Sequence, residues 1–114
     1  MNRSNPFSSL SPESLAEPVQ RLTAALHPYA IYLFGSHVHG VPQADSDIDL
    51  MVIVEDEPLT VEHHRLGYRC LRGMGLPVEL HLCTRARFDR FANVIGSIQY
   101  DVRRKGVLIY AAEA

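Results

Sequence analysis

The stretch from Leu33 to Val54 reads LFGSHVHGVPQADSDIDLMVIV, and the interpretation of the whole chain starts from it. An apolar run ends in Gly35-Ser36, a polar loop follows, and a second apolar run opens with Asp47 and Asp49. Successive strand side chains alternate between faces, so we expect Asp47 and Asp49 to point the same way, with Cα atoms about 7 Å apart. Charges inside a strand are costly unless they are paired. The two carboxylates therefore predict a site that shares one or two divalent cations.

The length and composition of the chain favour one compact domain. The chain has 114 residues, of which 46% are apolar, and this is enough for a core. We expect a flexible N-terminal tail over residues 1–10 and a single domain over residues 11–114. Cys70 and Cys83 fit no zinc or redox motif, and no segment resembles a signal peptide or a membrane span. A soluble, cytoplasmic protein with reduced thiols is the expectation.

Charge is unevenly distributed along the chain, although the formal net charge is only −2. Acidic residues gather between Asp45 and Glu57, whereas eight arginines and one lysine lie between Arg65 and Lys105. The acidic segment suggests cation binding. The basic half suits either phosphates or an acidic protein partner, or it is a solvated surface of mixed sign. Neither nucleic acid nor a membrane is an expected partner.

Helical and strand patterns alternate along the chain. One helix is expected to start at Ser11-Pro12-Glu13 and end at His27-Pro28, with Pro18 either kinking or restarting it. The other expected helices are a short one at Ser36–His39, one over Thr60–Met74, one capped by Thr84 and one ending near Lys105. The expected strands are Ala30–Phe34, Ile48–Val54, Val78–Leu82 and Val107–Tyr110. This order predicts an α/β (α+β) domain in which helices pack on one sheet, with Ile48–Val54 as a central strand.

Two further features bear on chemistry. Gly35-Ser36 lies where a strand meets an expected helix start, and free N–H groups at a helix N-terminus favour an anion such as a phosphate. By itself, a Gly-Ser pair is also an ordinary turn. Glu79 stands inside an apolar strand, where a lone carboxylate is costly, so it either joins the acidic site or faces solvent or an arginine at a sheet edge.

Taken together, these residues resemble the signature of the DNA polymerase β-like nucleotidyltransferase superfamily, and they are most similar to its minimal nucleotidyltransferase (MNT) family. The likeness consists of Gly35-Ser36, ten intervening residues, the phrase Ser46-Asp47-Ile48-Asp49-Leu50, and the tail Lys105-Gly106-Val107-Leu108-Ile109-Tyr110. It implies a polymerase β palm-like fold with a mixed sheet. It also implies that Asp47 and Asp49 are catalytic, metal-binding carboxylates, that Glu79 is the third of them, and that Gly35 and Ser36 bind the nucleoside triphosphate.

The resemblance further implies cofactors, a substrate and a partner. Mg²⁺ (or Mn²⁺) suits the oxygen ligands, and ATP is the implied substrate. Proteins of this kind are often antitoxins that bind a HEPN-domain toxin and add AMP to it, which implies an oligomer of some form. The leading hypothesis is therefore an adenylyltransferase with a protein acceptor. A small-molecule nucleotidyltransferase ranks lowest, because such relatives usually carry an additional helical domain.

One departure from the family pattern supports an alternative hypothesis. His39 stands where many relatives have an arginine, and histidine is only partly protonated near neutral pH. Some small relatives also lack a working third carboxylate, and both points support a non-catalytic module that neutralises its partner by contact. His81 shares a face with Glu79, either as a packed residue or as one that orients the acceptor.

Overall fold

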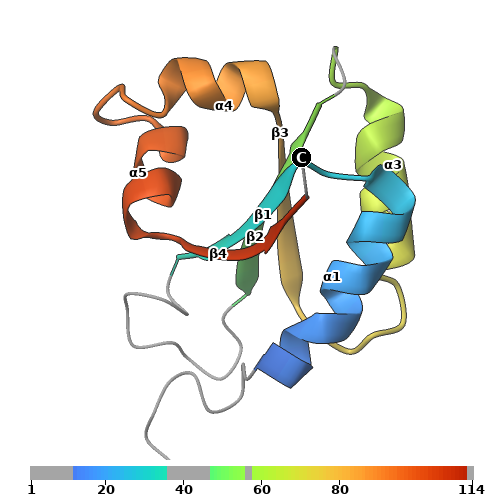
Figure 1. Ribbon diagram of the computed structural model, residues 1–114. Helices are drawn as coiled ribbons and strands as arrows, with labels where there is room; N and C mark the ends of the chain where they lie inside the picture. The colour runs from blue at the N-terminus through green and yellow to red at the C-terminus, as the bar shows by residue number, and fades with distance from the viewer. Residues whose placement is uncertain (1–11, 36–46, 56–57, 113–114) are drawn as a thin grey trace, which may run out of the picture.

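The computed structural model describes residues 12–35, 47–55 and 58–112 as a sheet between two helical layers (Figure 1). The helices are α1 (Pro12–Leu26), α3 (Val61–Cys70), α4 (Arg85–Phe91) and α5 (Ile98–Lys105). The strands are β1 (Ala30–Phe34), β2 (Ile48–Val54), β3 (Val78–Thr84) and β4 (Val107–Ala111). Figure 1 shows α1 and α3 on one face of the sheet, with α4 and α5 on the other. No helix in the described part of the chain is long and apolar enough to cross a membrane.

The sheet is mixed, with the order β3-β2-β1-β4. β1 runs antiparallel to both β2 and β4, while β2 and β3 are parallel. β2 is therefore an interior strand, and all its residues from Leu50 to Val54 are buried, as its unbroken apolar run predicts. The predicted α/β fold with helices on a mixed sheet is confirmed.

The larger core lies between the sheet and the layer of α1 and α3. It contains Leu15, Leu22 and Leu26 of α1, which recur at helical spacing, together with inward residues of the strands such as Leu50 and Leu80. α1 is continuous through the buried Pro18, so neither end of the helix falls there. Arg21 ties the two helices together, because its guanidinium donates to the carbonyl oxygens of Cys70 and Arg72 at 3.1 and 3.2 Å.

A second, smaller core lies under α4 and α5. It is built from Ala30, Met51, Ile53, Cys83, Phe88, Ala92 and Val102. The strand residues in this set alternate with those of the larger core, as the two-residue period of a strand requires. Asp49, Met51 and Ile53 share one face of β2, so Asp49 belongs to the same face of the sheet as this smaller core.

The expected element boundaries need three corrections. α3 ends at Cys70 rather than Met74, because Gly73 and Gly75 adopt φ of 82° and 77°, which leave the helical region. β3 continues to Thr84 rather than Leu82, since Cys83 and Thr84 still pair with β2. β4 likewise continues to Ala111, which pairs with Ala30. The expected tail, the short helix at Ser36–His39 and the loop that follows it lie outside the described residues.

Candidate metal and nucleotide site

The register of β2 and β3 brings two acidic residues side by side. In this parallel pair Asp49 lies opposite Glu79, and His81 follows two residues later on the same face of β3. One ligand atom from each of Asp49, Glu79 and His81 lies within 4.8 Å of the other two. Three potential metal-ligating side chains from neighbouring strands therefore converge at one point on the face that α4 and α5 cover.

The imidazole of His81 lies close to both carboxylates of this cluster. His81 Nε2 lies 3.2 Å from Asp49 Oδ1, a hydrogen-bond distance, and 3.9 Å from Glu79 Oε2. Among the ion pairs of the described residues, neither carboxylate meets an arginine or a lysine. The side chain of Asp49 is 22% exposed and that of Glu79 is 53% exposed, so the cluster is anchored in the sheet and open to solvent at Glu79.

The end of β1 forms one wall of the site. Phe34 pairs with Asp49 in the sheet, and its ring meets the imidazole of His81 edge-on, with the centroids 5.0 Å apart. Gly35 follows with φ of +88°, and a Cβ there would lie within 3.0 Å of Asp49 Oδ2. Glycine is thus required for two reasons, the left-handed backbone and the close approach of the turn to the carboxylate.

Asp47 is exposed, lies just before the start of β2, and is not a member of the three-residue cluster. Ser36 and His39, the other residues of the predicted nucleotide turn, lie outside the described part of the chain. The structure therefore brings Asp49 and Glu79 together beside Gly35. The catalytic, metal-binding and nucleotide-binding roles of Asp47, Asp49, Glu79, Gly35 and Ser36 remain predictions.

His81 is the residue that the sequence-based site omitted. The alternation of Glu79 and His81 along one strand was the available signal, because it puts both side chains on one face. Sequence alone could not show that Asp49 would be the direct neighbour of both, since that depends on strands distant in the chain.

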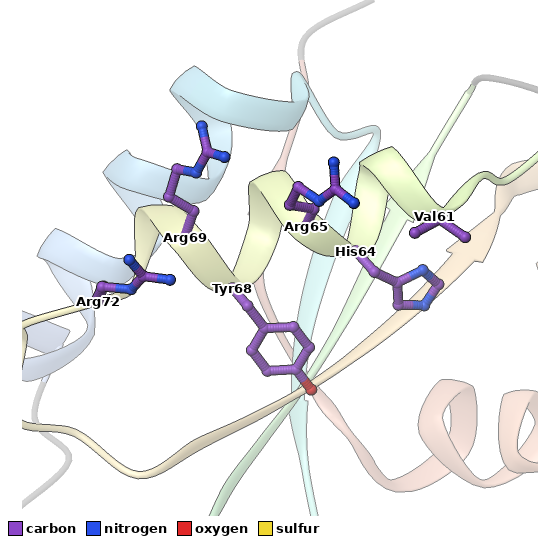
Figure 2. Close-up of a pocket in the computed structure, with 6 residues that line it drawn as sticks. All are labelled: Val61, His64, Arg65, Tyr68, Arg69 and Arg72. Carbon is purple, nitrogen blue, oxygen red and sulfur yellow. The ribbon is translucent and has the colours of Figure 1, made fainter.

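A second surface feature lies on the outer side of α3. A shallow hollow there is lined by Val61, His64, Arg65, Tyr68, Arg69 and Arg72, which Figure 2 shows as sticks along this helix. Tyr68 reaches the edge strand β3, where its hydroxyl donates to Leu80 O and accepts from Leu80 N–H, each at 3.2 Å. Three of the arginines between Arg65 and Lys105 therefore line one surface, on the face of the sheet opposite the acidic cluster.

The described part of the chain thus combines a mixed sheet, helices on both of its faces, and a carboxylate pair beside a glycine turn. A family model described as "Nucleotidyltransferase domain" matches residues 13–105, so the chain belongs to the nucleotidyltransferase domain family. The fold is similar to the crystal structure of a candidate nucleotidyltransferase from Sulfolobus solfataricus, with a TM-score of 0.66. That match covers 97% of this chain and 90% of the other at 19% identity, which supports a shared fold. No curated relative matches the sequence.

Proposed function

We propose that this chain is a nucleotidyltransferase, dependent on Mg²⁺ or Mn²⁺, that transfers AMP from ATP to a hydroxyl group of a partner protein. In the same proposal it is an MNT antitoxin and its partner is a HEPN-domain toxin. The observation that carries the proposal is the pairing of Asp49 with Glu79 on adjacent parallel strands, next to the glycine turn at Gly35. Family membership supports the class of reaction, and the resemblance of the sequence supports the acceptor and the partner.

The donor atoms fit a divalent cation. Asp49 and Glu79 offer carboxylate oxygens, which hard cations prefer, and no basic side chain other than His81 pairs with these carboxylates within the described residues. Two carboxylates held this close repel each other unless positive charge is supplied. A bound divalent cation would supply that charge and would stabilise the negative charge of the triphosphate.

In this reaction the protein mainly positions the two substrates and neutralises the negative charge of the triphosphate. The acceptor hydroxyl oxygen forms a bond to the α-phosphorus of ATP, the bond from that phosphorus to the bridging oxygen breaks, and pyrophosphate leaves while the hydroxyl proton passes to solvent. Asp49 and Glu79 hold the cation, with Asp47 as a further ligand from the residue before β2. Gly35 and Ser36 bind the triphosphate at the end of β1, and the missing Cβ of Gly35 leaves the room that the Asp49 carboxylate needs beside this turn.

The test is transfer of label from ATP carrying ³²P at the α-phosphate to a HEPN-domain protein, with Mg²⁺ or Mn²⁺ present. Asp49→Asn and Glu79→Gln should each lower the transfer rate by roughly 100-fold or more, because each removes a carboxylate from the site at constant shape. Asp101→Asn is the matched control, since Asp101 is an exposed carboxylate in the first turn of α5. Wild-type rates in Asp49→Asn and Glu79→Gln would overturn the proposal.

The alternative is a non-catalytic module of the same fold that neutralises its partner by contact. One observation favours it: His81 Nε2 already lies 3.2 Å from Asp49 Oδ1, so this carboxylate has a partner without any cation. In that case the partner would be neutralised equally well by wild type and by a variant carrying both Asp49→Asn and Glu79→Gln. Loss of neutralisation in the double variant, with binding to the partner retained, would exclude it.

A further inference from the structure

We infer that His81 is a nitrogen ligand of the cation in this site and that it shifts the preference of the site from Mg²⁺ toward Mn²⁺. The inference rests on the proposed function, because it assumes that Asp49 and Glu79 hold a divalent cation. It goes further by assigning a metal-binding role to a residue outside the predicted acidic set and by stating a metal preference.

The distances between donor atoms suit a shared ion. Two donors that bind one cation at about 2.1 Å each, at right angles, lie about 3 Å apart. His81 Nε2 lies 3.2 Å from Asp49 Oδ1 and 3.9 Å from Glu79 Oε2, and all three donors fall within 4.8 Å of one another. Small side-chain adjustments would therefore place all three around one centre.

The imidazole is held in place by its surroundings. The Phe34 ring packs against it at a centroid distance of 5.0 Å and an interplanar angle of 61°, and its side chain is only 26% exposed. β3 fixes its backbone through pairing with Met51 of β2. A ligand that is ordered in advance loses little side-chain entropy when the ion binds.

The chemistry of the donors then decides which ion is preferred. Mg²⁺ favours oxygen ligands and keeps several of its waters, whereas imidazole nitrogen is a ligand that later transition metals such as iron, nickel, copper and zinc prefer. Mn²⁺ accepts carboxylates as well and stands at the start of the series in which affinity for nitrogen-containing sites rises. A set of two carboxylates and one imidazole therefore discriminates against Mg²⁺ more than three carboxylates would.

The test compares the dissociation constants of Mn²⁺ and Mg²⁺, measured by calorimetry and by the electron paramagnetic resonance of free Mn²⁺. His81→Ala should weaken Mn²⁺ binding by about 10- to 100-fold while changing Mg²⁺ binding by less than about 3-fold. His81→Gln places an oxygen at a similar reach, so it should retain cation binding and move the preference toward Mg²⁺. His64→Ala, at an exposed histidine of α3 on the other face of the sheet, is the matched control and should behave as wild type.

Two further results separate this inference from the proposed function. If Asp49→Asn with Glu79→Gln abolishes binding of both ions but His81→Ala and His81→Gln keep the wild-type ratio of dissociation constants, His81 is not a ligand and the inference falls alone. If the double carboxylate variant binds both ions as wild type does, no cation site exists here and the proposed function falls with it. Circular dichroism of each variant confirms that the compared proteins are folded.

Discussion

At the scale of single residues, Gly35 is the position where backbone conformation and the site depend on each other most directly. Its φ of +88° lies in the left-handed region, and the space that a Cβ would take is filled by the Asp49 carboxylate. Gly73 offers a matched comparison, because it has a φ of +82° but nothing within 4 Å of the place that a Cβ would occupy. The two glycines separate backbone strain from displacement of a site residue.

Gly35→Ala should therefore cost about 1–3 kcal/mol of unfolding free energy and should also weaken Mn²⁺ binding by roughly 10-fold or more, because the methyl group pushes Asp49 aside. Gly73→Ala should lose about 1 kcal/mol through strain alone and should bind Mn²⁺ as wild type does. Urea denaturation and calorimetry measure the two effects. Equal metal binding in Gly35→Ala and wild type would mean that Asp49 does not need its observed position.

Sequence patterns predicted some of the residues of this site and missed one of their contacts. Asp49 and Glu79 were identified because carboxylates in apolar strands require an explanation. Gly35 was identified from its place between a strand and a polar loop. The direct contact of His81 with Asp49 was not predictable, since the two residues lie on different strands and are 32 positions apart in the chain.

At the scale of elements, local signals explain where most helices begin. Thr84 and Ser97 accept hydrogen bonds from the backbone N–H groups of Arg87 and Tyr100, so each caps its helix through its side chain. Thr60 does the same for α3, and His63 completes the capping box by accepting from Thr60 N–H at 3.0 Å. This capping role accounts for a histidine that lies beside Glu62 and His64 in the sequence.

The outer side of α3 is a candidate binding surface, and its charge can be tested. Figure 2 shows Arg69 and Arg72 along the exposed hollow, and no hydrogen bond or ion pair of either side chain occurs among the described residues. Because such a surface complements an acidic segment, we expect it to contact the partner protein in the proposed complex. Arg69→Glu combined with Arg72→Glu should weaken binding of a fluorescent oligoglutamate peptide by about 10-fold, since two exposed charge contacts are worth about 1 kcal/mol or slightly more.

The control is Arg103→Glu combined with Arg104→Glu, which reverses two exposed charges in the last turn of α5 and leaves the net charge of the two variants equal. This control should bind the peptide nearly as tightly as wild type. An equal loss in both double variants would show that the peptide senses only the total charge. The binding surface on α3 would then be rejected.

At the scale of the whole molecule, the chemical reactivity of the two cysteines measures how tightly each of the two cores is packed. Cys70 lies at the end of α3, partly buried, and burial raises the pKa of its thiol while nearby Arg21 opposes that rise. Cys83 is 2% exposed and belongs to the core under α4 and α5. Each thiol should therefore become more reactive when the helical layer that covers it separates from the sheet.

Iodoacetamide should alkylate native Cys70 more slowly than an unstructured cysteine peptide at pH 8, because a raised pKa leaves less thiolate at that pH. Cys83 should remain unmodified until the molecule unfolds globally, and urea should bring both to the rate of the peptide. Peptide mapping by mass spectrometry resolves the two sites. Labelling of Cys83 as fast as Cys70 in native buffer would contradict the packing of α4 and α5 on the sheet.

The sequence by itself determined the order of helices and strands and the interior position of β2, and it predicted acidic and glycine residues for the candidate site. These follow from hydrophobic periodicity, from capping residues and from the cost of charge in apolar strands, all of which act over short distances in the chain. Only the tertiary structure decided the strand order β3-β2-β1-β4, the register that sets Asp49 beside Glu79, and the contact of His81 with Asp49. Register depends on how two whole faces pack against two layers of helices, and no local pattern contains that information.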